Sequence, residues 1–120
     1  MIYATSELQQ AIDAADLSDE QRHWLRSTQS LQRGTAFDGA IAAGVSPDDA
    51  PDNSNPMKAL SGQWNLTLGR ACHQIADQLG WTPQPKRFWI DLMVTFEDEA
   101  NKTDGQIIWV LRPQWVNLHI

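Results

Sequence analysis

Apolar residues near the start of the chain recur at the spacing of an α-helix. Ser6 is followed three residues later by Gln9, which is the capping-box pattern that begins many helices. Four apolar residues then fall on one side of a helix with 3.6 residues per turn: Leu8, Ala11, Ile12 and Ala15. This pattern predicts a helix over residues 6–16.

The same pattern occurs again directly afterwards. Ser18 and Gln21 repeat the capping-box spacing, and Gly34 is a residue suited to end a helix. We therefore expect a second helix over residues 18–33. Its narrow, less polar face is formed by Trp24, Thr28 and Leu31.

A third, shorter helix is predicted over residues 35–45, with Gly44 at its end. Its inward side is expected to consist of Phe37, Ala40 and Ile41. Residues 46–56 then contain three prolines, three aspartates and two asparagines, a composition typical of a loop. A single turn at Ser46–Pro47 fits this composition, but Pro51 prevents a longer helix.

The best-supported element is a long helix over residues 56–79. Either of the two polar residues before Pro56 can cap it, and Gly80 can end it. Eight of its residues fall within one third of the helix circumference and are expected to face the core: Met57, Leu60, Trp64, Leu68, Ala71, Cys72, Ile75 and Leu79. Two internal glycines each cost about 1 kcal/mol relative to alanine, which favours a kink or a break near Gly62 or Gly69.

After the long helix the pattern changes to an alternation of apolar and polar residues. This alternation predicts a strand over residues 88–96. Its apolar face would be formed by Phe88, Ile90, Leu92, Val94 and Phe96. Residues 98–105 are polar and end in Asp-Gly, which is typical of a hairpin turn, and residues 106–112 form a second strand that is apolar on both faces. Residues 115–120 are a candidate third strand after a break at Pro113.

These elements predict an α+β fold: N-terminal helices, one long amphipathic helix and a C-terminal antiparallel β-hairpin or three-stranded sheet packed on it. The length of 120 residues corresponds to one domain. We expect a helical part (1–45), a loop (46–56) and a helix with an antiparallel sheet (57–120).

The net charge of −6 argues against general attraction to nucleic acid or to anionic lipid. The longest strongly apolar run, Ile107–Leu111, is far shorter than the ~20 residues that cross a bilayer. The single cysteine, Cys72, cannot form a disulfide within the chain, and the first twenty residues are too acidic for a signal peptide. A cytoplasmic protein without membrane contact is therefore expected.

No combination of residues forms a recognised catalytic or metal site. Cys72 and His73 are adjacent on the predicted helix, so they point in different directions and cannot act as a nucleophile and its base. Cys72 is expected to be a buried thiol. His73 with Asp77, and Glu20 with His23, have spacings that suit a metal, but neither pair is accompanied by further ligands. We expect no cofactor and no metal, and an enzyme is unsupported.

Three arginines on the second helix form the clearest charged feature. Arg22, Arg26 and Arg33 share one stripe, which is a candidate surface for an acidic protein or for nucleic acid; pairing with carboxylates of the same chain is the alternative. Directly afterwards, residues 35–46 resemble the first helix and turn of a helix-turn-helix unit. The recognition helix would be residues 47–56, which contain three aspartates and no Lys or Arg.

Six tryptophans are unusual for a chain of this length. Trp89 and Trp109 fall on predicted strands whose two faces cannot both pack on one helix. The outer face is therefore expected to be covered by a second protomer, by another protein or by the N-terminal helices, with Trp89 or Trp109 as a contact residue.

The predicted function is non-catalytic protein binding, as an adaptor module with an unidentified protein partner or as a homodimer. A helix-turn-helix-like regulator that binds DNA is the alternative. The third possibility is a small enzyme or metal protein without a recognisable motif.

Overall fold

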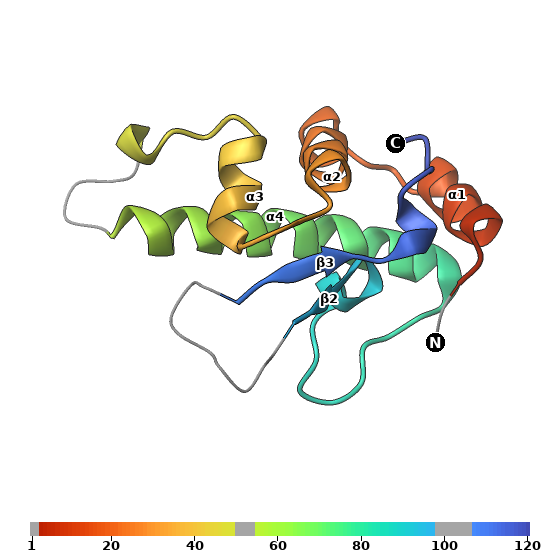
Figure 1. The fold of residues 1–120 in the computed structure, drawn as a ribbon. Helices are drawn as coiled ribbons and strands as arrows, with labels where there is room; N and C mark the ends of the chain where they lie inside the picture. Colours follow the sequence, from red (N-terminus) through yellow and green to blue (C-terminus); the bar gives the residue numbers. More distant parts are fainter. Residues whose placement is uncertain (1–2, 50–54, 98–106) are drawn as a thin grey trace.

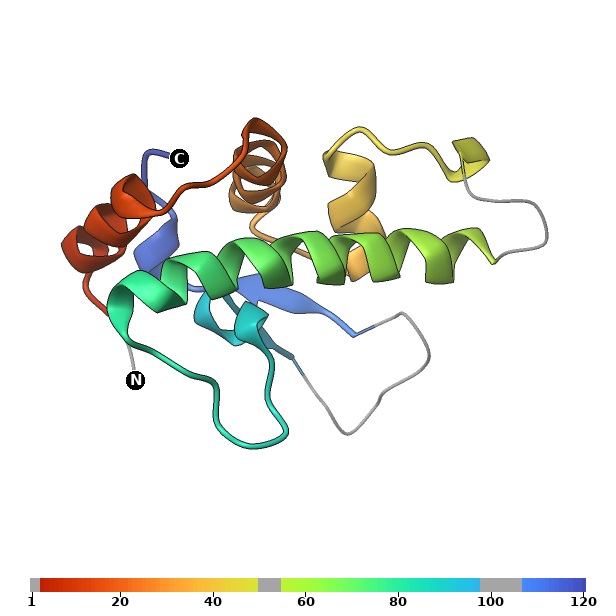
Figure 2. The same ribbon diagram turned by 180° about the vertical axis from the view of Figure 1, so that it is seen from behind.

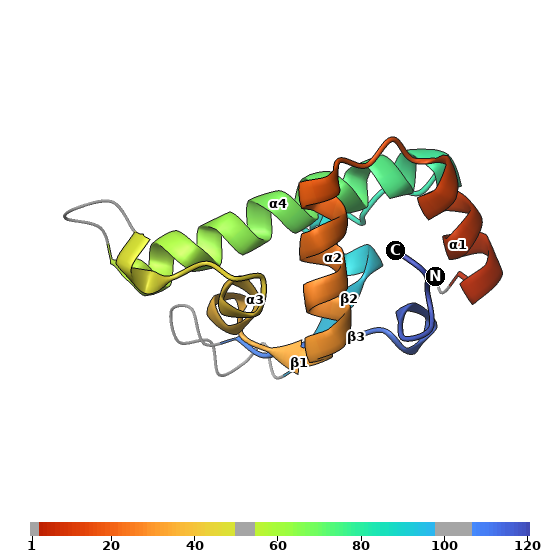
Figure 3. The same ribbon diagram turned by 90° about the horizontal axis from the view of Figure 1, so that it is seen from above.

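The computed structural model describes residues 3–49, 55–97 and 107–120. Its central element is the long helix α4 (Pro56–Leu79), and three shorter helices lie along one side of it (Figures 1 and 3). These are α1 (Thr5–Ala14), α2 (Asp19–Leu31) and α3 (Ala36–Ala42). A small antiparallel sheet packs against α4 from another side, which confirms the predicted α+β fold.

The sheet has three strands in the order β1-β3-β2. The strands are β1 (Arg33–Gly34), β2 (Val94–Phe96) and β3 (Trp109–Leu111). The predicted hairpin is confirmed, because β2 pairs with β3 and places Val94 opposite Leu111 and Phe96 opposite Trp109. The predicted turn at residues 98–105 lies outside the described residues.

The long helix matches its predicted bounds. The Asn55 side chain accepts a hydrogen bond from the Met57 amide at 3.0 Å, and Gly80 ends the helix in the left-handed conformation with φ 68°. The helix continues through Gly62 and Gly69, so of the expected kink or break the break does not occur. Most of the predicted core face is buried, whereas its two ends, Met57 and Leu79, keep part of their surface exposed.

Local capping explains where the other helices begin. Ser18 and Gln21 form the predicted reciprocal pair at 3.1 and 2.9 Å. The predicted cap of the first helix is wrong: α1 begins after Ala4, whose amide donates to Glu7. The third helix has the predicted position, but Ile41 is exposed rather than inward, since the close contact with α4 is made through smaller residues.

The prediction that Gly34 ends the second helix is also wrong. Gln32 adopts the left-handed conformation and ends α2, and the next two residues form β1. β1 pairs with β3, and the Leu111 amide donates to the Gln32 carbonyl at 2.8 Å. The N-terminal half of the chain therefore supplies the third strand of the sheet.

Two predicted strands are partly or wholly replaced by 3₁₀ turns. Residues 88–96 form a strand only at β2, because Trp89–Leu92 adopts a 3₁₀ turn in which the Phe88 amide donates to the Asp91 side chain at 3.2 Å. This turn interrupts the alternation of inward and outward side chains. As a result Met93 is buried and Phe88 is exposed. Residues 115–120 form no strand; a 3₁₀ turn at Pro113–Trp115 leads into an irregular C-terminal segment.

Residues 47–49 form the expected single turn after α3, and residues 50–54 lie outside the described part of the chain. None of the helices that the structure describes is both long enough and apolar enough to cross a bilayer. Figure 2 views the molecule from the side on which α4 is nearest the reader. From this side, no described helix or strand covers the middle of α4.

Candidate functional site: a groove along the long helix

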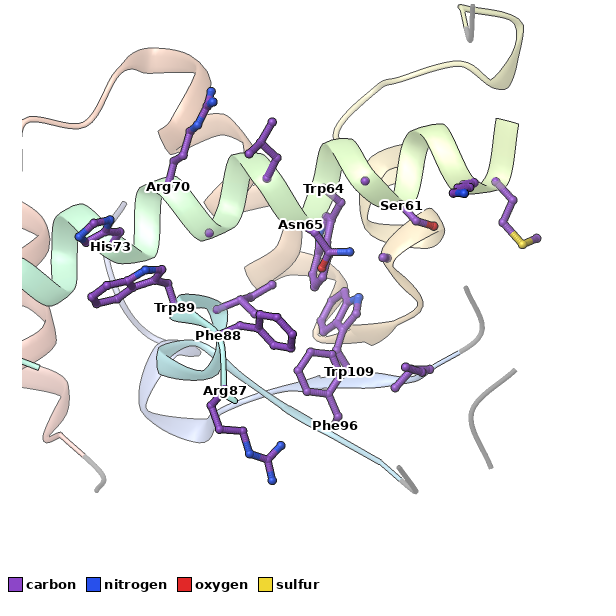
Figure 4. A pocket seen from close by; sticks show the side chains of 18 of the residues that line it. Ser61, Trp64, Asn65, Arg70, His73, Arg87, Phe88, Trp89, Phe96 and Trp109 are labelled. Carbon is purple, nitrogen blue, oxygen red and sulfur yellow. The ribbon is translucent and has the colours of Figure 1, made fainter. Parts of the chain in front are cut away.

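A cavity of about 1040 Å³ lies along α4. Its lining comes from one side of α4 between Met57 and His73, from the segment 87–90, from Phe96, Ile107 and Trp109 of the hairpin, and from Ala36 and Asn55. We call this cavity the α4 groove. Figure 4 shows that it is bounded by aromatic side chains from α4, the 87–90 segment and the sheet.

The floor of the groove is a pair of stacked indoles. The rings of Trp64 and Trp109 lie 5.4 Å apart at an interplanar angle of 17°, and both side chains are fully buried. Trp64 donates its indole N–H to the Thr28 hydroxyl at 3.1 Å, and Trp109 donates to the Thr35 carbonyl at 2.8 Å. Because both polar groups are paired and both rings are packed, the floor is rigid.

One end of the groove is closed by a second aromatic stack. The imidazole of His73 on α4 lies parallel to the indole of Trp89, with ring centroids 3.9 Å apart. Trp81 meets Trp89 edge to face at 6.2 Å, and Nε2 of His73 is 3.6 Å from a carboxylate oxygen of Asp77. The His73–Trp89 stack joins the 87–90 segment to α4.

Apolar side chains are unusually exposed around the groove. Phe88 is 66% exposed, Leu66 is 55% exposed and Met57 is 38% exposed. Half of the six large hydrophobic residues that are exposed in the described chain line this one cavity. Such a cluster is typical of a surface that another molecule covers.

The charged side chains in the described lining of the groove are positive, whereas the whole protein is acidic. Lys58, Arg70 and Arg87 contribute to its lining, and none of the described lining residues carries a carboxylate, although the chain has a net charge of −6. Figure 4 shows the Arg70 and Arg87 side chains extending away from each other, so the positive charge lies at the rim.

Ser61 adds a polar group to the same lining. Its side chain is on α4, is 8% exposed, and its hydroxyl has no hydrogen-bond partner among the described residues. Buried hydroxyls in native proteins are usually hydrogen-bonded, so the unpaired Ser61 hydroxyl is an exception among the described residues.

The arginine stripe lies elsewhere and is partly used within the molecule. Arg33 forms an ion pair with Glu97 at 2.7 Å, and Arg26 donates to the Ile120 carbonyl at 3.0 Å. Arg22 is half-buried on α2. For two of the three arginines the structure thus shows an intramolecular contact.

The two candidate tryptophans are placed differently. Trp89 lines the α4 groove and keeps part of its surface exposed. Trp109 is fully buried against Trp64 of α4, so of the two candidates only Trp89 keeps a surface that a partner could contact. The indole N–H of Trp109 is paired with the Thr35 carbonyl, so the N-terminal half of the chain contacts this residue.

Cys72 and His23, which were candidates for catalysis or metal binding, are buried or hydrogen-bonded within the fold. Cys72 is buried as expected, and burial, aided by the negative charge of Asp91, raises the pKa of its thiol to about 12. His23 is hydrogen-bonded to the Ala43 carbonyl at 2.7 Å. Within residues 3–49, 55–97 and 107–120, no three metal-binding side chains come together.

Sequence reasoning missed most of the groove. Phe88 was assigned to the apolar face of a strand, and Leu66, which lies outside the core face of the long helix, was not singled out. One pattern in the sequence does indicate the groove. Leu66 lies between Gly62 and Gly69 on the same side of the helix, and this side is too polar for the core but contains an apolar residue.

Comparison of the chain with protein-family models, with curated proteins and with solved structures found no match.

Proposed function

We propose that this protein is a non-catalytic binding module that holds a segment of another protein in the α4 groove. The observation that carries the proposal is the cluster of exposed apolar side chains around one cavity: Phe88, Leu66 and Met57. Exposed aromatic residues beside a packed pocket are typical of the residues that dominate binding energy in protein interfaces.

The rigidity of the groove supports this function. The buried Trp64–Trp109 stack forms the floor, and the His73–Trp89 stack fixes the neighbouring segment. A groove that is already formed loses little conformational entropy when a partner binds. The cysteine lies in the core with a raised pKa, so it is not a nucleophile for a ligand in the groove.

The test is a selection of random displayed peptides on the full chain, followed by measurement of the dissociation constant of each recovered peptide by fluorescence anisotropy. Phe88→Ser is expected to weaken binding about tenfold or more. Because Phe88 is 66% exposed, this change should leave the fold intact, which circular dichroism would verify.

Ile41→Ser is the matched control, because Ile41 is 40% exposed on α3 and does not line the groove. This variant should bind the peptides as the unaltered protein does. Peptides whose affinity is unchanged by Phe88→Ser, or is reduced equally by both variants, would show that the α4 groove is not the binding site.

A further inference from the structure

The middle of α4 presents an open strip of helix backbone inside the groove. Gly62, Leu66, Gly69 and His73 follow one another at spacings of three or four residues, so they lie on one side of the helix, and all four line the cavity. Among the described residues, a methyl group added at Gly62 or at Gly69 would meet nothing within 4 Å outside its own turn of the helix.

These glycines are unfavourable for the helix, and nothing in the described fold requires them. Glycine inside a helix is less stable than alanine, and neither residue has a positive φ or a close neighbour. Their effect is to lower the surface of α4 on both sides of Leu66. A partner's backbone can approach α4 more closely there than at any larger residue.

Ser61 adds a buried polar group next to the glycines. Ser61 precedes Gly62, is 8% exposed, and its hydroxyl is unpaired among the described residues. The hydroxyl oxygen is itself buried, so it is a polar position beneath the groove and not a contact point on its open surface.

The length of the groove matches that of a short helix. The lining extends along α4 from Met57 to His73, which corresponds to about 24 Å at 1.5 Å per residue. A helix of about 16 residues has the same length, and amphipathic helices bind such grooves through a stripe of apolar residues.

We propose that the occupant of the α4 groove is an acidic, amphipathic helix of another protein, an inference that rests on the proposed function. Its apolar stripe packs on Leu66, Phe88 and Trp89, its backbone passes close to Gly62 and Gly69, and its carboxylates face Lys58 and Arg70. The sign of the charge follows from a described lining with Lys and Arg and without carboxylates. A second copy presenting the same groove is disfavoured, since it would bring like charges together.

The test uses a displayed library of peptides of about 16 residues with a fixed helical apolar stripe. The remaining positions vary among Glu, Lys, Gln and Ser. Peptides selected on the full chain are expected to be enriched in Glu over Lys. The double variant Lys58→Glu with Arg70→Glu is expected to reverse this preference, because both side chains are exposed and their replacement changes the charge of the rim.

A second double variant, Gly62→Ala with Gly69→Ala, separates binding from folding. It is expected to raise the urea midpoint of unfolding and at the same time to weaken peptide binding about tenfold or more. A structural role alone would change only stability. Gln63→Ala is the matched control on α4, since Gln63 is exposed and outside the groove, and it should not change binding.

The outcomes distinguish this inference from the proposed function. Selection of neutral or basic peptides that still require Phe88 would overturn the acidic partner and leave groove binding intact. Acidic peptides that bind the glycine variant with unchanged affinity would overturn the close helix approach. Peptides that do not require Phe88 would overturn both, and equal competition by random duplex DNA would assign the groove to nucleic acid instead.

Discussion

At the scale of single residues, the contact between Gly39 and Trp64 fixes the distance between α3 and α4. Gly39 is buried, and a methyl group built on it would overlap the indole ring of Trp64. The ring cannot move aside easily, because it is stacked on Trp109 and hydrogen-bonded to Thr28. Glycine is therefore required at this position for close packing.

Gly39→Ala is expected to lower the free energy of unfolding by about 2 kcal/mol, because the overlap with Trp64 outweighs the higher helix propensity of alanine. Urea denaturation would measure the change. Gly62→Ala is the control, since its methyl group has open space and should raise stability by up to about 1 kcal/mol. Equal effects of the two substitutions would contradict this explanation.

At the scale of elements, the C-terminal segment is held by side-chain amides of the first two helices. The Gln29 amide donates to the carbonyls of Trp115 at 2.7 Å and of Leu118 at 2.8 Å. Gln9 exchanges two hydrogen bonds with the His119 backbone, both at 2.8 Å. These contacts satisfy backbone groups that a strand would otherwise have paired in the sheet.

Gln29→Glu keeps the size of the side chain but places carboxylate oxygens against backbone carbonyls. We expect it to destabilise the protein by about 1–3 kcal/mol and to accelerate amide hydrogen exchange in residues 115–120. Hydrogen exchange followed by mass spectrometry would measure this. Gln63→Glu introduces the same charge on exposed α4 and should leave the C-terminal segment protected; similar exchange in both variants would argue against the anchoring role.

At the scale of the whole molecule, the core contains an ionisable group whose protonation affects stability. Burial and the charge of Asp91 raise the pKa of Cys72 from 9.0 to about 12. Above pH 9 the unfolded chain releases this proton while the native protein retains it. Stability is therefore unaffected by this group below pH 9 and falls as the pH rises from about 9 towards 12.

The loss is expected to be at most about 1.4 kcal/mol per pH unit in that range. Urea midpoints measured near pH 8 and near pH 10.5 would show it. Cys72→Ala is expected to be less stable at both pH values but to lose less between them, because it has no thiol to ionise. Parallel losses in the variant and in the unaltered protein would contradict the assignment to Cys72.

The sequence by itself determined the features that depend on neighbouring residues. The bounds of α4 follow from Asn55, Pro56 and Gly80, and the start of α2 follows from Ser18 with Gln21, because capping hydrogen bonds join residues two to four positions apart. The core face of α4, the burial of Cys72 and the pairing of β2 with β3 were predictable for the same reason: local periodicity and a short connection specify them.

Only the tertiary structure decided which distant segments meet. Gln32 ends α2 and Arg33–Gly34 becomes a strand because β3 offers hydrogen-bond partners there, and no local signal marks this pairing. The 3₁₀ turn at Trp89–Leu92 overrides the alternation, which moves Phe88 from the expected core to the rim of the α4 groove. The groove itself exists because segments far apart in the chain converge on one side of α4, and a periodicity read within each segment contains no information about that convergence.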